Sequence, residues 1–308
     1  MSSFDAAVIG SGPAGVTAAL YLVRSGCSVI LFEKMAAGGQ ILQTEALENY
    51  PGYPKGIKGY ELADLFAAHL EGLPVTHRRD AVESVSGEAG NFVVQAGGKE
   101  HSCRTVIVCS GAHHRELGLA DEKRLQGRGV SYCALCDGNF FRNAPVAVVG
   151  GGNAALEESL YLAKLASKVY LIHRRDEFRG AKIYQDKLES MPDKVELVRS
   201  SVVTALHGEN ALTSLSVRDL KTDEIRQISV EGLFIYVGFE PATAYLPAAL
   251  ERDAQGFIVT DTEMRTSIPG IFAAGDVRSK LCRQVITAAG DGATAAQAAF
   301  VFLEQLHV

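Results

Sequence analysis

The feature that most constrains this chain is a pattern that occurs twice. A short β-branched run, a glycine-rich turn and an amphipathic helical stretch begin near residue 4 and again near residue 146. Each copy leads into a second apolar run. This order predicts a strand, a right-handed crossover helix and a parallel strand. Two copies within 308 residues predict two similar domains rather than a repeat array.

The first glycine turn has the spacing G-x-G-x-x-G and begins at Gly10. Its first glycine permits a tight turn, its second lets a pyrophosphate approach the backbone, and its third lets the helix pack on the strand. Glu33 follows at the end of the second strand, where a carboxylate can accept the ribose hydroxyls of an adenosine. The order predicts a dinucleotide site, and a tight turn without a ligand is the alternative.

The second turn reads Gly150-x-Gly152-x-x-Ala155, and it lacks the acid at the following strand end. That position carries a basic cluster instead: His173, Arg174, Arg175 and Arg179. Planar guanidinium groups suit a 2′-phosphate, so the cluster predicts NADPH rather than NADH. A solvated basic turn, with Asp176 and Glu177 paired to the arginines, stays open as the alternative.

Two dinucleotide sites in one chain are most simply explained if the first holds FAD and the second NADPH. A hydride then passes from the nicotinamide to the flavin. Near the end of the chain, Gly275 and Asp276 follow a short apolar run. A carboxylate at a strand end can hold the ribityl and pyrophosphate region of a flavin, which supports this assignment.

Of six cysteines, only Cys133 and Cys136 lie close together, as a C-x-x-C pair. In a cytosolic chain with βαβ patterning such a pair predicts redox chemistry. A structural zinc site needs four ligands, and two buried thiols form the remaining alternative. A helix that begins at Cys133 favours its thiolate, and Asp137 is a candidate proton donor or acceptor. The other four cysteines are expected to be structural, Cys282 least clearly, and His113 and His114 are expected at a hinge rather than at a metal.

Charge and hydropathy limit the partners. The net charge of −6 and the pI of about 5.8 argue against nucleic acid as the main partner. No apolar run approaches the ~20 residues of a membrane helix, and the N-terminus lacks a basic segment followed by an apolar one. We therefore expect a cytoplasmic protein with no membrane or nucleic-acid partner.

The simplest architecture inserts the second βαβ domain into the first. We predict an α/β protein with two Rossmann-like three-layer dinucleotide-binding domains. The FAD domain is expected to be discontinuous, over 1–115 and 243–308, and the NADPH domain with the C-x-x-C pair is expected over 116–242. The crossings contain Gly111 and Gly118 on one side and Gly238 and Pro241 on the other.

Six segments carry a family resemblance: VIGSGPAG, GGQI with ENYPG, CALCDG, VVGGGNAALEESLYL, HRRDEFR and GIFAAGDV…CRQVITAAGDG. They run in order from residue 8 to about 292. On these segments the chain resembles the bacterial-type, low-molecular-weight thioredoxin reductases, which are FAD-dependent pyridine-nucleotide disulfide oxidoreductases. The inserted-domain layout is also that of this family.

The resemblance implies roles residue by residue. It assigns to FAD the residues Gly10, Ser11, Gly12, Pro13, Ala14, Glu33, Gly39, Gln40, Asn49, Gly275, Asp276, Arg283, Gln284 and Val285. It assigns to NADPH the residues Gly152, Asn153, Ala154, His173, Arg174, Arg175 and Arg179. It makes Cys136 the flavin-proximal sulfur, Cys133 the interchange thiol and Asp137 the catalytic acid.

The resemblance also implies a function: NADPH reduces FAD, FAD reduces the Cys133–Cys136 disulfide, and the dithiol reduces oxidised thioredoxin. It implies a homodimer, and a rotation between the two domains that brings either the disulfide or the nicotinamide to the flavin. Three alternatives stay open. They are the same flavoenzyme with another disulfide acceptor, a reductase fed by a ferredoxin- or flavodoxin-type donor or a dithiol oxidase that uses oxygen, and a nucleotide-binding redox sensor without turnover.

Overall fold

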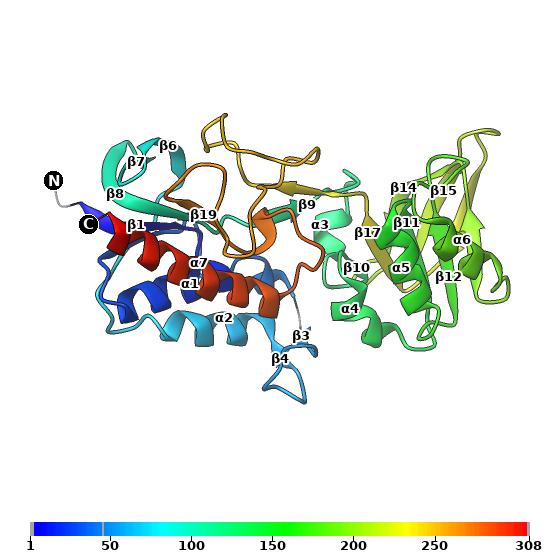
Figure 1. The fold of residues 1–308 in the computed structure, drawn as a ribbon. Coiled ribbons are helices and arrows are strands. Elements are labelled where there is room, and N and C mark those ends of the chain that lie inside the picture. Colours follow the sequence, from blue (N-terminus) through cyan, green and yellow to red (C-terminus); the bar gives the residue numbers. More distant parts are fainter. Residues whose placement is uncertain (1–2, 45, 307–308) are drawn as a thin grey trace. The chain divides into compact units, whose positions relative to one another are not determined.

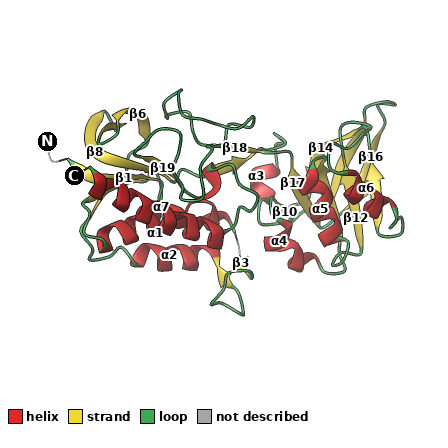
Figure 2. Cartoon of the chain, in the orientation of Figure 1, coloured by secondary structure: helices red, strands yellow, loops and turns green. Residues whose placement is uncertain are grey.

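The computed structural model describes residues 3–44 and 46–306, which divide into two compact units. Within these residues, unit 1 comprises 3–44, 50–113 and 240–306, and unit 2 comprises 46–49 and 114–239. The segments where the chain passes between the units carry the short strands β9 (Ala112–His114, Figure 1) and β18 (Phe239–Pro241, Figure 2). The short segment 46–49 clusters with unit 2, which no sequence pattern indicated.

Unit 1 is built on a sheet with the strand order β5-β2-β1-β8-β7-β6, and β19 pairs with the second half of β8. Strands β5, β2, β1, β8 and β19 run parallel, while β6, β7 and β8 are antiparallel neighbours. The bounds of these strands are β1 Phe4–Ile9, β2 Val29–Phe32, β5 Val75–Arg78, β6 Val82–Glu88, β7 Asn91–Ala96, β8 Lys99–Val108 and β19 Ile271–Ala273. The short strand β4 (Ile57–Lys58) precedes helix α2.

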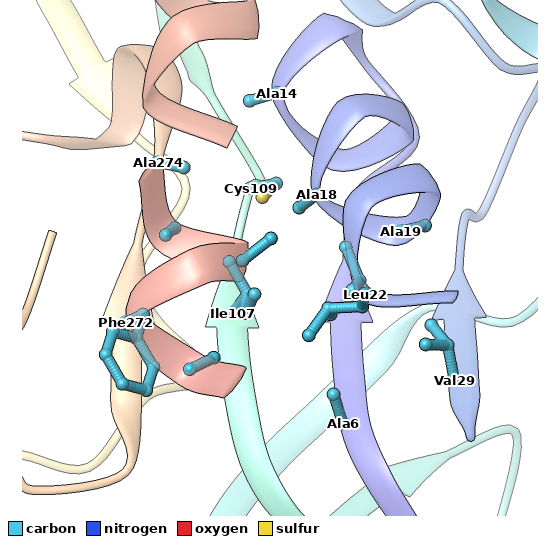
Figure 3. Packing of buried hydrophobic residues seen from close by; sticks show 14 of the residues in the cluster. Ala6, Ala14, Ala18, Ala19, Leu22, Val29, Ile107, Cys109, Phe272 and Ala274 are labelled. Carbon is cyan, nitrogen blue, oxygen red and sulfur yellow. The ribbon is translucent and has the colours of Figure 1, made fainter. Parts of the chain in front are cut away.

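The helices of unit 1 are α1 (Pro13–Arg24), α2 (Gly59–Ala68) and α7 (Val285–Gln305), with 3₁₀ turns η1 (Gly39–Gln43) and η3 (Gly275–Val277). Helices α1 and α7 lie side by side against one face of the sheet (Figure 2). Small side chains line their contact, as Figure 3 shows for Ala14 and Ala18. A Cβ atom on Gly292 of α7 would lie 2.2 Å from the carbonyl oxygen of Ala14, so only glycine permits this approach.

Helix α7 differs from the prediction that the chain has no apolar run of membrane length. Among the described helices, α7 alone is long and apolar enough to cross a membrane, judged by length and composition. It carries Asp291 in its second turn and packs its alanines on α1 in the core of unit 1. That packing is typical of a core helix. Core helices can be as long and as apolar as a membrane-spanning helix, so the length and composition of α7 do not indicate a membrane span.

Unit 2 is built on a five-stranded parallel sheet with the order β10-β17-β11-β12-β13. A second, antiparallel sheet has the order β14-β15-β16. The strands are β3 Ala46–Leu47, β10 Val130–Ser131, β11 Pro145–Gly150, β12 Lys168–Ile172, β13 Val195–Val198, β14 Ser201–His207, β15 Ser214–Asp219, β16 Ile225–Ser229 and β17 Gly232–Tyr236. The helices are α3 Glu122–Leu125, α4 Ala134–Asp137, α5 Asn153–Leu162 and α6 Lys182–Glu189, with the 3₁₀ turn η2 Gly138–Phe141.

Alternating residues of β11 explain the layers of unit 2. Val146 and Val148 pack in one cluster with residues of α5, whereas Ala147 packs in another cluster with residues of β14 and β15. Side chains of a strand point alternately to its two faces, so both faces of the parallel sheet are covered. Unit 2 therefore has three layers: helices, a parallel sheet and an antiparallel sheet.

Candidate active site

The first glycine turn is tightly packed at Gly10 and Gly15 and open at Gly12. Gly10 has φ +103°, and a Cβ there would lie 2.4 Å from the carbonyl oxygen of Cys109. A Cβ on Gly15 would lie 1.8 Å from the carbonyl oxygen of Gly10. At Gly12 the nearest atom to a Cβ is 3.9 Å away. This open side faces the start of α1, where the first-turn N–H groups and the helix dipole suit a pyrophosphate.

The acid predicted for the adenosine ribose lies next to this turn. Glu33 follows β2, and its carboxylate accepts the N–H of Ser11 at 2.8 Å and the N–H of Met35 at 3.0 Å. These two hydrogen bonds fix the orientation of the carboxylate. A carboxylate has about four acceptor positions, so it can also accept ribose hydroxyls.

The segment around Gly39 also lies against the turn. The N–H of Gly38 donates to the carbonyl oxygen of Ser11 at 2.8 Å, and a Cβ on Gly39 would lie 3.4 Å from the Cα of Gly12. The side-chain amide of Gln40 lies 3.3 Å from Nδ1 of His113. Asn49, in contrast, belongs to the segment that clusters with unit 2, so its place at the flavin stays a prediction.

A buried carboxylate in unit 1 marks where a ligand hydroxyl would fit. Gly275 has φ +79° and starts the turn that follows β19, and Asp276 comes next. Within the described part of the chain, Oδ1 of Asp276 is buried and has no hydrogen-bond partner. Burial raises the pKa of this carboxyl group. An unsatisfied buried acceptor is unfavourable, and a hydroxyl of the FAD ribityl chain would satisfy it. The residues therefore fit FAD.

Asp291 holds the Asp276 turn in place, although no sequence pattern singled it out. Asp291 of α7 accepts the N–H of Gly275 at 3.0 Å, Nζ of Lys280 at 2.7 Å and Nη1 of Arg278 at 2.9 Å. All three side chains are about nine-tenths buried. The G-D-G run at 290–292 was the only signal in the sequence, and it gave no hint of the partners.

The segment predicted beside the flavin ring forms the approach to α7. The Arg283 guanidinium lies 4.0 Å from the centre of the Phe257 ring, and it donates to the carbonyl oxygen of Arg278 at 3.1 Å. Burial lowers the pKa of Arg283, although not enough to discharge a guanidinium. Gln284 is the N-cap residue of α7, and Val285 is its first residue.

The second glycine turn, in unit 2, has the same construction. Gly150 has φ +155°, and a Cβ there would lie 2.6 Å from the carbonyl oxygen of Tyr236. Around Gly152 there is no atom within 4 Å of a Cβ among the described residues, so the turn is open there. Asn153 begins α5, and its Oδ1 accepts the N–H of Ala181 at 2.7 Å. Ala154 is exposed beside it.

The basic cluster is tied to this turn by its backbone. The N–H groups of Arg179 and Gly180 donate to the carbonyl oxygen of Gly151 at 2.7 and 3.0 Å. The buried His173 ring stacks on Phe178 with centroids 5.3 Å apart. Burial lowers the pKa of His173, and the neighbouring arginines lower it further, so the ring is neutral at pH 7.

The arginines of the cluster are available for an anion. Asp176, which could have paired with them, accepts instead from Nζ of Lys221 at 2.8 Å and from the Ser200 hydroxyl at 3.2 Å. Across residues 3–44 and 46–306 no ion pair involves the exposed side chains of Arg174, Arg175 or Arg179. Three unpaired guanidinium groups beside a nucleotide turn fit a 2′-phosphate.

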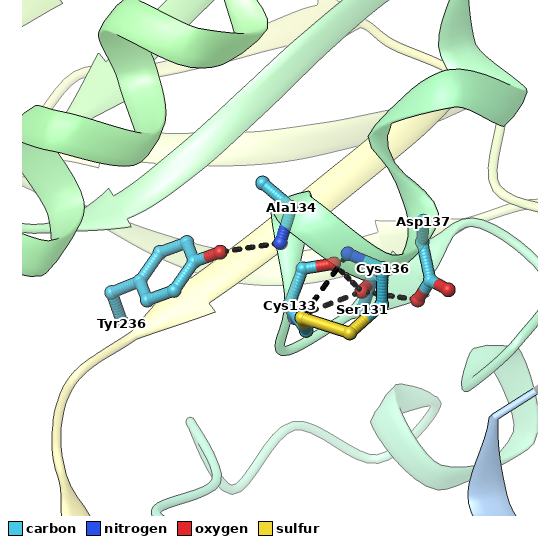
Figure 4. The surroundings of a disulfide bond; sticks show 6 residues. All are labelled: Ser131, Cys133, Ala134, Cys136, Asp137 and Tyr236. Carbon is cyan, nitrogen blue, oxygen red and sulfur yellow. Dashed lines mark hydrogen bonds between the residues drawn. A yellow bond between two sulfur atoms is a disulfide. The ribbon is translucent and has the colours of Figure 1, made fainter. Parts of the chain in front are cut away.

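The C-x-x-C pair forms a disulfide in unit 2 (Figure 4). Cys133 is the N-cap residue of α4, and its Sγ accepts the N–H of Cys136 at 3.2 Å. The N–H of Ala134 donates to the hydroxyl of Tyr236 at 2.6 Å. Burial raises the pKa of Tyr236 well above its usual value, so this hydroxyl keeps its proton. Tyr236 was not singled out from the sequence, because it lies 102 residues further along the chain.

Asp137 is the last residue of α4, and Oδ2 of its carboxylate lies 2.6 Å from the Ser131 hydroxyl (Figure 4). Two of the remaining cysteines are not placed for the same chemistry. Cys103 and Cys109 are buried, and burial raises the pKa of Cys103 to about 12. In the described residues no group of three or more His, Cys, Asp or Glu side chains could hold a metal ion.

Two nucleotide turns and a disulfide between neighbouring cysteines define a dinucleotide-dependent disulfide reductase. The profile of the family described as pyridine nucleotide-disulphide oxidoreductase matches residues 4–292. A thioredoxin reductase of Treponema pallidum is 41% identical over 306 residues, which are 99% of each chain. One of Listeria innocua is 42% identical over 305 residues, which are 98% of this chain and 95% of that protein. The crystal structure of thioredoxin reductase from Streptococcus pyogenes has a TM-score of 0.92 and 43% identity, and the match covers 98% and 99% of the two chains.

This chain belongs to the pyridine nucleotide-disulphide oxidoreductase family. The family resemblance is thereby confirmed, as are the two-domain α/β dinucleotide-binding fold and the oxidoreductase class. The predicted cofactors, FAD and NADPH, are those of this family. The roles of single residues at each cofactor stay predictions.

Proposed function

We propose that this chain is a thioredoxin-disulfide reductase that takes electrons from NADPH. The observation that carries the proposal is the Cys133–Cys136 disulfide with Asp137 directly after it, in the same unit as a nucleotide turn and its arginine cluster. Relatives that match nearly the whole chain bear the name thioredoxin reductase. A sensor without turnover would not need an intact C-x-x-C-D beside two complete nucleotide turns.

The proposal divides the chain between the two cofactors. Unit 1 holds FAD through the Gly10 turn, Glu33 and Asp276, and unit 2 holds NADPH through the Gly152 turn and the arginine cluster. These assignments follow the predicted domains, with the FAD domain over 1–115 and 243–308 and the NADPH domain over 116–242. FAD, when bound, accepts a hydride from NADPH and supplies two electrons to the disulfide.

The protein's own cysteines carry the electrons to the acceptor. Two electrons break the Cys133–Cys136 bond and leave two thiolates, which take up protons. The Cys133 thiolate attacks a sulfur of the acceptor disulfide, forms a mixed disulfide and releases one acceptor thiolate. Cys136 then attacks Cys133, which restores the internal disulfide and releases the second acceptor thiol. The Cys136 N–H that points at Cys133 Sγ stabilises the thiolate in this cycle.

The test is anaerobic NADPH oxidation by the purified yellow protein, with thioredoxin from the same organism as acceptor and NADH in parallel. We expect rapid oxidation of NADPH that depends on thioredoxin, and much slower oxidation of NADH. Flavin reduction without thioredoxin turnover would redirect the proposal to another disulfide acceptor. No flavin reduction by either nucleotide would favour a ferredoxin-type donor.

The arginine cluster gives the first mutational prediction. Arg175→Ala removes a charge-assisted contact with the 2′-phosphate, and such contacts contribute about 1.5–3 kcal/mol. We therefore expect the KM for NADPH to rise roughly 10- to 100-fold while the KM for NADH stays unchanged. Steady-state rates with both nucleotides measure this.

Arg226→Ala is the matched control, because Arg226 is an exposed arginine of unit 2 that pairs with Glu196 at 2.7 Å. It should leave both KM values unchanged. An equal loss of NADPH and NADH binding in Arg175→Ala would show that the cluster does not read the 2′-phosphate.

The proposal extends to assembly and location. We propose a homodimer, and the exposed apolar side chains Tyr21, Tyr60 and Leu65 on α1 and α2 support an association surface on unit 1. The molar mass in solution tests this.

We also propose a cytoplasmic enzyme without a membrane or nucleic-acid partner, in keeping with its acidic charge and its dithiol chemistry.

A further inference from the structure

A buried serine connects the interchange cysteine with the candidate catalytic acid. Ser131 ends strand β10, and only 5% of its surface is exposed. Its Oγ lies 2.6 Å from Oδ2 of Asp137 and 3.1 Å from the backbone nitrogen of Cys133 (Figure 4). The hydroxyl therefore contacts both Cys133 and the carboxylate of Asp137, which lies four positions further along the chain.

The direction of these hydrogen bonds follows from the groups themselves. The Cys133 N–H can only donate, so Ser131 Oγ accepts from it. An ionised carboxylate can only accept, so the single hydroxyl proton of Ser131 points at Asp137. The distance of 2.6 Å is typical of a charge-assisted O–H···O⁻ bond. The carbonyl oxygen of Cys133 is 3.4 Å from the same hydroxyl and competes poorly for its proton.

The flanking segment keeps Ser131 in place. Ser131 pairs with Phe234 in the parallel sheet, and the next residue, Tyr132, donates its hydroxyl to the buried Glu122 carboxylate at 2.8 Å. The Ser131 hydroxyl is thus a fixed point, whereas Asp137 is at the end of a helix of only one turn. A donor on the strand can hold the carboxylate in one orientation.

We propose that Ser131 is the positioning residue for Asp137, and that its hydroxyl holds the carboxylate where it exchanges a proton with the Cys133 sulfur. When the disulfide is reduced, protonated Asp137 gives its proton to the Cys133 thiolate and becomes a carboxylate, which takes a proton back from Cys133 when that sulfur attacks the acceptor disulfide. Between these two steps the Ser131 O–H donates to the carboxylate and holds it in place. This inference rests on the proposed function, because it assigns Asp137 the role of acid in disulfide exchange.

The test compares Ser131→Ala, Ser131→Thr and the control Ser159→Ala in the full-length, FAD-loaded protein. Ser159 is a buried serine of the same unit, and its hydroxyl donates to the carbonyl oxygen of Ala155 at 2.7 Å. Acceptors are thioredoxin and a small aromatic disulfide, DTNB. Reduction of the flavin by NADPH is followed separately by the loss of its visible absorbance.

We expect kcat for both acceptors to fall on the order of ten-fold in Ser131→Ala, with the KM for thioredoxin and the rate of flavin reduction unchanged. Ser131→Thr keeps the hydroxyl and should restore most of kcat. Ser159→Ala should match the wild type. A merely structural role would alter flavin reduction or KM together with kcat, and threonine would not rescue it.

Two outcomes would overturn the inference: an unchanged kcat in Ser131→Ala, or a loss that the threonine variant shares in full. DTNB separates this test from the proposed function. If the wild type reduces DTNB but not thioredoxin, the proposed acceptor is wrong, while the comparison of the serine variants with DTNB still decides the role of Ser131.

Discussion

Replacing Cys136 with serine should abolish the reduction of any disulfide acceptor while FAD stays bound. The loss should be roughly a thousand-fold or more, as expected when a residue that forms a covalent intermediate is removed. The reason is that serine cannot form the disulfide that Cys136 makes with Cys133. FAD should be retained because the Gly10 turn, Glu33 and Asp276 all belong to unit 1.

The measurement pairs thioredoxin-dependent NADPH oxidation with the visible spectrum of the purified variant. Cys282→Ser is the control, since Cys282 is an exposed, free cysteine and its loss should leave turnover unchanged. Turnover by Cys136→Ser above a few per cent of the wild type would mean that electrons leave the protein by another route. Loss of the yellow colour would mean that Cys136 supports FAD binding. That result would contradict the proposal that unit 1 holds FAD.

The sequence predicted the local structure around the candidate site well, while the roles of single residues stay predictions. Glycine turns, strand ends and the C-x-x-C pair are contiguous patterns, and a short peptide already determines their geometry. The turn at Gly150 is an example, because its positive φ and its contact with Tyr236 permit only glycine. The arginine cluster likewise follows a strand end whose place relative to the turn is fixed by the βαβ connection.

The contacts that support these parts could not be predicted, because they join residues that are distant in sequence. Tyr236 reaches the first residue of the redox helix across 102 positions. Asp176 turns away from the arginines because Lys221, 45 positions further along, offers it a partner. The sequence alone left the pairing of Asp176 with the arginines open. In the structure, residues of β12 and β15 pack in one core cluster, and Lys221, which follows β15, pairs with Asp176, which follows β12.

Asn49 illustrates a second limit. The motif around it gave a role at the flavin, but the segment 46–49 clusters with unit 2, whose redox helix α4 it contacts. Glu48 of that segment accepts from the side chain of Asn139 at 2.8 Å. A four-residue segment that clusters with another unit has no signature in composition or periodicity, so the segment was predicted to belong to the surrounding domain, over 1–115.

Replacing Asp291 with alanine should give the largest loss of stability in unit 1. The carboxylate neutralises two cations, Arg278 and Lys280, whose side chains are only 11% and 10% exposed. Removing one member of a buried ion group leaves uncompensated charge and costs about 3–5 kcal/mol. It also removes the acceptor for the N–H of Gly275. The free energy of unfolding of the FAD-loaded protein, from denaturant titration, measures the effect.

The same substitution should weaken FAD binding, because Asp291 fixes the turn on which Asp276 lies. Asp291→Asn tests this link if the alanine variant does not fold, since the amide keeps an acceptor for Gly275 but loses the charge. FAD retained after dialysis is the readout. Glu263→Ala is the control, because Glu263 pairs with Arg265 at the surface of the same unit and should cost less than about 1 kcal/mol. If Asp291→Ala retained both its stability and its FAD, the buried charges would have to be compensated by Asp276 alone. The orphaned oxygen of Asp276 would then be the partner of Lys280 rather than the position for a ribityl hydroxyl.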